Sequence, residues 1–307
     1  MEIQEKYSYG GWRNCIRLSN GNIELIATTD VGPRIIRFGF VGEQNMFREF
    51  PDQMGKTGGD EYRLYGGSRF WHGPEANPRC YYPDNNPVSY SWNGKTLKLT
   101  QETEVTTGIQ KETEVILNQE ENQVSLIYRL YNKNLWDIEL APWVLTIMNL
   151  GGRAIVPQEP FQAWEERLAP VRPLVLWAYT KMNDPRWIWG AKYIQLKQDP
   201  DAKSRQKLGI LNTLGWAAYY LKGDLFIKRY KYDPEAKYTD FGVNTEIYTD
   251  PDIFEVETLG AFGKIPTGGF VEHKESCSLF KTNIDESEES IDKNVLPMVK
   301  KTDNFSV

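Results

Sequence analysis

The stretch Asn244-Thr-Glu-Ile-Tyr-Thr-Asp-Pro-Asp-Ile-Phe-Glu-Val-Glu-Thr-Leu-Gly260 alternates apolar residues with carboxylates at its C-terminal end. In an extended backbone, successive side chains point to opposite faces, so Phe254, Val256 and Thr258 share one face and the odd-numbered residues share the other. Glutamate forms strands poorly, so Glu255 and Glu257 at alternate positions call for a reason. Two explanations are open: a solvated outer face, or a cleft in which Glu257 acts as a general base.

The composition indicates an ordinary globular chain that is rich in aromatic residues. Its 307 residues include 40% hydrophobic and 25% charged residues, with 10 Trp, 17 Tyr and 13 Phe. Such aromatics suit both sandwich cores and clefts in which sugars stack. The net charge of −6, without long runs of Lys and Arg, disfavours a nucleic-acid partner.

The cysteines and the absence of known sequence motifs further limit the classes of protein to which the chain can belong. Three scattered cysteines lack a disulfide or zinc spacing, and no apolar run is long enough for a membrane partner, so we expect a cytoplasmic protein with reduced thiols. The sequence has no P-loop, dinucleotide fingerprint, HExxH or GxSxG, and we predict no cofactor. Asp250, Asp252 and Glu246 lie near carbonyl-rich turns without Ca²⁺-loop spacing, so no metal site is assigned.

Turn signals between short alternating runs predict an all-β, antiparallel sandwich. Asn20-Gly21 is a strong hairpin signal, and strands recur about every ten residues from 88 to 157. The nearly continuous apolar run 142–152 predicts a central strand that is buried on both faces. We expect less than about 15% helix, with at most a short helical insert at 161–168. Residues 1–285 are predicted to form a single domain, and residues 286–307 a frayed, polar C-terminal tail.

A second polar stretch lies within the long Gly- and Pro-rich segment 51–90, in Gly66-Gly-Ser-Arg-Phe-Trp-His-Gly-Pro-Glu75. Long loops of this kind are often functional. Arg69 and Glu75 could hydrogen-bond sugar hydroxyls while Trp71 stacks on a ring, or the same residues could tie down the loop. Arg34, at the mouth of the strand after Gly32-Pro33, could serve a ligand or face solvent.

We predict that polar and aromatic residues from these two distant stretches share one cleft. The members of this predicted cleft are Arg69, Trp71, His72, Glu75, Asn244, Glu246 and Glu257.

Taken together, these motifs make the chain resemble the galactose mutarotase-like superfamily, nearer its poorly characterised members than true aldose 1-epimerases. The resemblance rests on the 66–75 motif, on Ala141-Pro-Trp with Gly151-Gly-Arg-Ala-Ile-Val-Pro157, and on Glu255-Val-Glu-Thr-Leu-Gly260. It covers most of residues 12–281. It implies a β-supersandwich that holds a sugar on the concave face of one large antiparallel sheet.

The resemblance also implies residue roles. In mutarotases a late Glu takes the proton of the anomeric hydroxyl while a His protonates the ring oxygen, and Glu257 matches that Glu. The family's Asn-His pair falls on Val144-Leu145, so the expected histidine is missing. His72, with an ordinary pKa near 6.5, is the candidate acid, whereas His273 is more typical of a satisfied, partly buried histidine. Arg69, Lys207 or Lys222 could instead stabilise charge on the ring oxygen.

Three functions follow as expectations. The first is a sugar-binding, aldose 1-epimerase-like isomerase. The second is a non-catalytic carbohydrate-binding protein that keeps the cleft without proton transfer. The third is a lyase or hydrolase that cleaves an oligosaccharide with paired carboxylates. In each case the expected partner is a small sugar or oligosaccharide.

Overall fold

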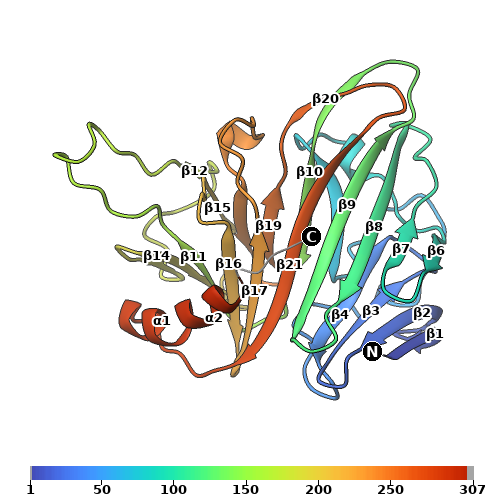
Figure 1. Cartoon of the computed structure of the whole chain (residues 1–307), viewed down its shortest axis with the longest axis horizontal. Helices are drawn as coiled ribbons and strands as arrows, with labels where there is room; N and C mark the ends of the chain where they lie inside the picture. The colour runs from blue at the N-terminus through green and yellow to red at the C-terminus, as the bar shows by residue number, and fades with distance from the viewer. Residues whose placement is uncertain (1, 303–307) are drawn as a thin grey trace.

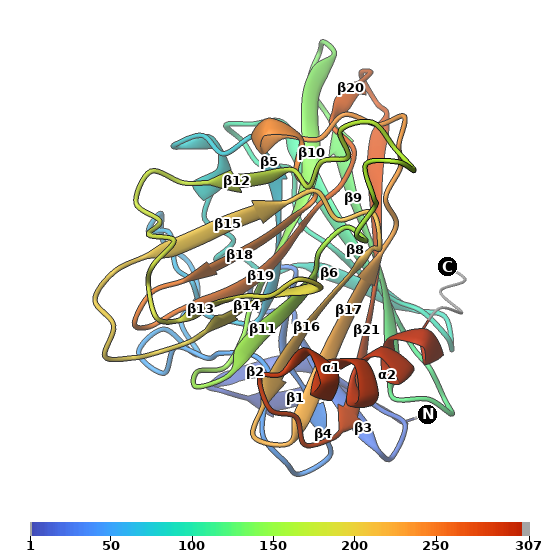
Figure 2. The same cartoon turned by 90° about the vertical axis from the view of Figure 1, so that its left-hand side faces the viewer.

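In a computed structural model that describes residues 2–302, the chain forms two antiparallel β-sheets that face each other (Figure 1, Figure 2). Strands make up 46% of the structure and helices 6%. The predicted all-β sandwich and its low helix content are therefore confirmed.

The larger sheet, counted within residues 2–302, has eleven strands. Strand β20 (Gly263–Ile265) pairs with β10, outside the main path. The other strands lie side by side in the order β1 (Glu2–Tyr9), β2 (Trp12–Ser19), β3 (Ile23–Thr28), β4 (Arg34–Phe40), β5 (Ser68–Gly73), β10 (Ile138–Ile147), β19 (Phe254–Leu259), β18 (Thr245–Thr249), β15 (Gln206–Ile210) and β12 (Leu174–Leu176).

The second sheet has ten strands in the same described range. Their order is β13 (Trp187–Trp189), β14 (Tyr193–Lys197), β11 (Arg153–Pro157), β16 (Trp216–Leu221), β17 (Asp224–Tyr230), β21 (Phe270–Lys281), β9 (Gln123–Asn132), β8 (Ile109–Leu117), β7 (Leu97–Thr100) and β6 (Ser89–Trp92).

Strand β10 is central, as its apolar run predicts. It pairs with β5 on one side and with β19 on the other, and most of its residues are buried. The inner faces of the two sheets meet in one hydrophobic core. There Phe226 of the second sheet packs edge-on against Phe38 of β4 and against Phe47, at ring distances of 6.2 and 5.9 Å.

Two glycines allow the segment before β5 to approach β4. Gly66 and Gly67 have φ values of +110° and +74°, which other residues rarely adopt. A Cβ atom on Gly67 would lie only 2.2 Å from the carbonyl oxygen of Ile35. The glycines of this motif therefore serve backbone packing that places β5 in the sheet.

The C-terminal region differs from the predicted frayed tail. Two helices, α1 (Glu288–Asn294) and α2 (Leu296–Lys301), pack on the second sheet, and 3₁₀ turns occupy Arg79–Tyr81 and Asp240–Gly242. Ile291, Val295 and Val299, spaced four residues apart, bury one apolar stripe against that sheet. The remainder of the predicted tail, 303–307, lies outside the described residues, as does Met1. No helix in the described residues is long and apolar enough to cross a membrane.

The helical insert predicted at 161–168 is wrong, because this segment consists of turns and irregular backbone. It belongs to a projecting loop, residues 158–173, which we call the arm and which stands out on the left of Figure 1 in yellow-green. Its large apolar side chains stay in solvent, with Phe161 83% exposed. A helix of this length gains its stability mainly from packing an apolar face, and here that packing is missing.

Candidate functional site

Strand β19 has the alternation that its sequence predicts. Phe254 and Val256 enter the core between the sheets, whereas Glu255 and Glu257 lie on the opposite face of the larger sheet. That face is not a solvated surface, because Glu255 is only 8% exposed and Glu257 is fully buried. The interpretation of the carboxylates as a solvated outer face is therefore wrong.

A cleft of about 460 Å³ lies over this face. Strands β5, β10, β15, β18 and β19 contribute to it, and loop residues complete its walls. It is lined by Tyr62, Leu64, Arg69, Trp71, Glu75, Tyr81, Trp143, Leu145, Trp177, Tyr179, Arg205, Lys207, Tyr248, Asp250, Ile253 and Glu255.

One wall of the cleft is a packed group of aromatic rings. Trp71 contacts Trp143 and Tyr81 edge-on, with ring centroids 5.5 and 4.9 Å apart. Tyr62 packs edge-on against both Trp71 and Tyr81. Because each ring is fixed by its neighbours, this wall is pre-formed for a ligand with an apolar face.

Beneath the cleft, Lys207 bridges two buried carboxylates. Its Nζ lies 2.6 Å from Glu246 Oε2 and 3.2 Å from each oxygen of Glu257. Trp143 Nε1 donates a hydrogen bond to Glu257 Oε2 at 2.9 Å. We call Lys207, Glu246 and Glu257 the lysine cluster. The Lys207 ammonium also lies 5.1 Å from the Trp143 ring and 4.8 Å from the Trp177 ring, which holds it at the cleft floor.

The electrostatics of this cluster are unusual. Burial raises the pKa of Glu246 well above its ordinary value, although Lys207 opposes that shift. Burial alone would lower the pKa of Lys207, but Glu257 and Glu246 outweigh it and raise that pKa. These directions favour a charged Lys207 beside a neutral Glu246. Perturbed groups of this kind under a cleft are typical of functional sites.

Several carboxyl oxygens of the cluster lack a hydrogen bond of good geometry. Among the described residues, these include both Glu246 oxygens and Glu257 Oε1, even though Lys207 is within ion-pair distance. Both observations hold if the Lys207 ammonium attracts these oxygens through its charge while none of its N–H bonds points at them. Buried polar groups left in this state require an explanation; the proton on a neutral Glu246 is one, and a ligand in the adjoining cleft is another.

Arg69 and Glu255 form the second charged pair of the cleft. Arg69 NH2 lies 3.5 Å from Glu255 Oε1, its guanidinium lies 4.5 Å from the Trp71 ring, and it donates a hydrogen bond to Tyr62 Oη. Burial and the nearby Glu257 raise the pKa of Glu255 to about 7, against the opposing effect of Arg69. The long contact to Arg69 explains why burial prevails.

The structure brings together five of the predicted site residues. Arg69, Trp71 and Glu75 line the cleft, and Glu246 and Glu257 lie directly below it in the lysine cluster. The Tyr81 hydroxyl donates a hydrogen bond to Glu75.

His72 is not in the cleft, contrary to the prediction. It follows Trp71 in β5, so its side chain points to the opposite face and is fully buried between the sheets. Burial, with Lys111 and Arg79 nearby, lowers the pKa of His72 to about 2. The nearest carboxylate is Glu104, 3.9 Å from Nε2. A ring that is neutral at physiological pH and turned away from the cleft does not fit the role of acid there.

Arg34 and Asn244 are also outside the cleft, and both hold the backbone in place. Arg34 donates to the carbonyl oxygens of Leu64 and Gly66 and pairs with Asp84 at 2.6 Å. Asn244 exchanges two hydrogen bonds with the backbone of Asn212 and is fully buried. The prediction that they bind a ligand is replaced by a structural role.

The sequence analysis missed most of the aromatic wall and Glu255. Trp143 and Tyr248 lie within stretches that the motifs singled out but were not assigned to the cleft, and Trp177 comes from a segment that no motif covers. Glu255 could have been found, because the same alternation that selected Glu257 places it on the same face.

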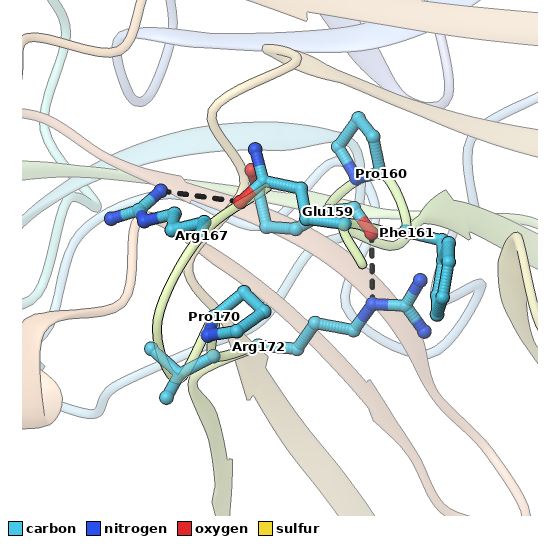
Figure 3. A pocket seen from close by; sticks show the side chains of 8 residues that line it. Glu159, Pro160, Phe161, Arg167, Pro170 and Arg172 are labelled. Atoms are coloured by element: carbon cyan, nitrogen blue, oxygen red, sulfur yellow. Dashed lines mark hydrogen bonds between the residues drawn. The ribbon is translucent and has the colours of Figure 1, made fainter. Parts of the chain in front are cut away.

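A second hollow, of about 300 Å³, lies within the arm (Figure 3). It is formed by one exposed segment that curls on itself: Arg172 Nε donates to the Glu159 carbonyl oxygen at 2.8 Å, and Arg167 to Gln162 at 3.4 Å. No buried carboxylate or aromatic wall lines it, so among the described residues the cleft is the better candidate site.

Comparisons with known proteins agree on the fold. No protein-family model matches the chain, and no curated protein matches its sequence. A galactose mutarotase-like protein from Lactobacillus casei is 10% identical, with a TM-score of 0.56 over 87% of this chain and 100% of that chain. A galactose mutarotase-like protein from Clostridium acetobutylicum is also 10% identical, with a TM-score of 0.56 over 92% and 99%.

A TPR-domain containing protein from Parabacteroides distasonis is 14% identical, with a TM-score of 0.60 over 88% of this chain. This chain spans 48% of the length of that protein. Together these likenesses show that the chain has the galactose mutarotase-like fold, which confirms the predicted resemblance at the level of the fold.

Proposed function

We propose that the protein binds a sugar in the cleft and interconverts its anomers, as an aldose 1-epimerase does. The observation that carries this proposal is the lysine cluster, whose buried carboxylate oxygens lie unsatisfied below an aromatic-walled cleft on the galactose mutarotase-like fold. A cleft of this size, with an aromatic wall and charged groups around it, suits a small polar molecule.

The cleft offers partners for both kinds of surface that a sugar presents. A pyranose has apolar C–H faces that stack on rings such as Trp71, and a rim of hydroxyls that donate and accept hydrogen bonds. Arg69 supplies donors, while Glu75 and Asp250 supply acceptors around the same cleft. The mixture of rings and charges therefore supports a polyol over a purely apolar ligand.

Glu257 is the proposed base. It would take the proton of the anomeric hydroxyl as the bond between the anomeric carbon and the ring oxygen breaks, giving an open-chain aldehyde that closes again on either face. Trp143 and Lys207 hold its carboxylate from two sides, which fixes its orientation. A positioned base contributes about 10² to 10⁴ in rate.

The test is an NMR exchange experiment on a panel of aldoses with the unmodified protein. Acceleration of α to β interconversion for at least one sugar supports the proposal. If no aldose is accelerated, the proposed isomerase activity is refuted.

One observation favours a second candidate, a carbohydrate-binding protein without catalysis. Leu145 lines the cleft where the resemblance places the family's catalytic histidine. Sugar binding measured by calorimetry, in the absence of any accelerated interconversion, would select this candidate and reassign Glu257 as a hydroxyl acceptor.

A further inference from the structure

The proposed reaction needs a proton donor for the ring oxygen, and the two histidines of the chain do not supply it. His72 is buried on the far face of β5, and His273 accepts or donates a hydrogen bond with Thr258 at 3.0 Å, also on the core side of β19. The donor must therefore come from another residue type at the cleft.

Glu255 occupies a suitable place. It lines the cleft directly, on the same face of β19 as Glu257 and two residues before it. Side chains at such positions stand roughly 7 Å apart along a strand, so a sugar ring that contacts Glu255 over β19 lies above the buried Glu257. In the sheet register, Glu255 pairs with Tyr248, which in turn pairs with Lys207.

We propose that Glu255 is the general acid of this site, an inference that rests on the proposed sugar isomerase function. In the ring-opening step, its carboxyl O–H gives a proton to the ring oxygen, which keeps the electron pair of the breaking carbon–oxygen bond. Glu257 accepts the proton of the anomeric hydroxyl, and a carbonyl forms at the anomeric carbon. Ring closure reverses both transfers, so each carboxyl returns to its first state and no co-reactant is consumed.

The surroundings of Glu255 suit both of its forms. Burial, Glu257 and Asp250 favour the protonated acid, whereas Arg69 on β5 and Lys207 on β15 favour the carboxylate. The balance brings its pKa to about 7, near the value at which an acid catalyst works best in neutral solution. After proton transfer, the guanidinium of Arg69 at 3.5 Å stabilises the new carboxylate.

The other donors at the cleft fit the role less well. The pKa of Lys207 is raised because it faces two carboxylates, and burial raises the pKa of Tyr179 to about 12. Both hold their protons too firmly to exchange them in each cycle near neutrality. They can orient a hydroxyl or stabilise charge. The neutral Glu246 carboxyl does not line the cleft, which leaves proton transfer to Glu255.

The experiment compares the pH dependence of kcat/KM for anomer interconversion in the unmodified protein, Glu255→Gln and a matched control. Glu24→Gln is that control, because Glu24 on β3 is also 8% exposed and contacts two arginines, yet does not line the cleft. For the unmodified protein, kcat/KM should fall as the pH rises above about 7, because the acid is lost.

Glu255→Gln should lower kcat/KM by about 10² to 10⁴ and remove the fall above neutrality, while Glu24→Gln keeps both the rate and the fall. If Glu255→Gln keeps a rate within a few-fold of the unmodified protein and the same pH profile, the inference is overturned while the isomerase function stands. If the unmodified protein accelerates no aldose, the proposed function fails and Glu255 loses its role with it.

A folding defect is separable from a catalytic one. Circular dichroism checks each variant first. If Glu255→Gln does not fold, Glu255→Asp keeps a carboxyl at the position. A reduced rate that still falls above neutrality then supports the inference, and a profile without that fall overturns it.

Discussion

Replacing Glu255 by Gln should stabilise the fold at alkaline pH, even though it removes an ion pair with Arg69. The pKa of Glu255 is raised from 4.5 to about 7 in the folded protein, first by burial and then by Glu257. The folded state therefore holds this proton more tightly than the unfolded chain does. Its stabilising contribution is complete below pH 4.5 and is lost as the pH rises through about 7.

The magnitude follows from the two pKa values. The interval between 4.5 and about 7 corresponds to roughly 3 kcal/mol of folding free energy, which the carboxylate form lacks above pH 7. Because Glu255 is only 8% exposed, solvent screening reduces this figure little. Glutamine resembles the protonated acid, so the variant should escape the loss.

Urea unfolding of both proteins at about pH 5 and about pH 8 measures the effect. The difference in unfolding free energy, variant minus unmodified protein, should grow by roughly 2.5 kcal/mol between these conditions, because a small part of the loss already occurs by pH 5. Glu24→Gln should instead have a lower unfolding free energy than the unmodified protein at neutral pH. Arg17 and Arg37 outweigh burial and lower the pKa of Glu24, so its charge stabilises the fold. A difference for Glu255→Gln that stays constant or shrinks with rising pH would refute the reasoning.

Three further predictions concern the site and the chain. Glu257→Gln should reduce turnover by about 10² to 10⁴ while sugar affinity by calorimetry stays nearly unchanged; a fully active variant would remove Glu257 as the base. His72→Asn should leave kcat/KM at neutral pH unchanged, because the ring faces the core; a large loss would return His72 to the site. Limited proteolysis should cut first in the arm, with residues 1–285 behaving otherwise as one domain; cleavage into two separately stable halves would contradict this.

The faces of β19 could be predicted from its sequence because alternation is a local property. Glu255 and Glu257 share a face in any strand, whatever its neighbours. Which face is buried depends on β10 and β18, and those partners come from distant sequence. The burial of Glu257 beneath Lys207 therefore emerges only from the sheet register.

The error over His72 has a different origin. The sequence around it is rich in Gly and Pro, which is typical of a loop, and in a loop neighbouring side chains can share a cleft. In the structure the same residues are strand β5, and strand alternation sends Trp71 and His72 to opposite faces. The structural role of Asn244 could not be predicted for another reason. Its partner Asn212 is distant in sequence and is brought to it only by the pairing of β15 and β18.

The sequence analysis did not predict the C-terminal helices, because polar and charged residues surround the few apolar residues that have helical spacing. The residues around Glu288 are charged, which is typical of a tail, and Pro297 interrupts the pattern. Ile291, Val295 and Val299 nevertheless recur every fourth residue, and the sheet surface against which they pack decides the outcome.

The position of β10 between β5 and β19 sets an order of events during synthesis of the chain. Strand β10 can pair with β5 as soon as both have left the ribosome, but its other edge waits until residues 254–259 have been made. An apolar strand with an open edge is prone to pair with other chains. The nascent protein therefore carries an unfinished central sheet through much of its translation, and the cleft is among the last parts of the molecule to form.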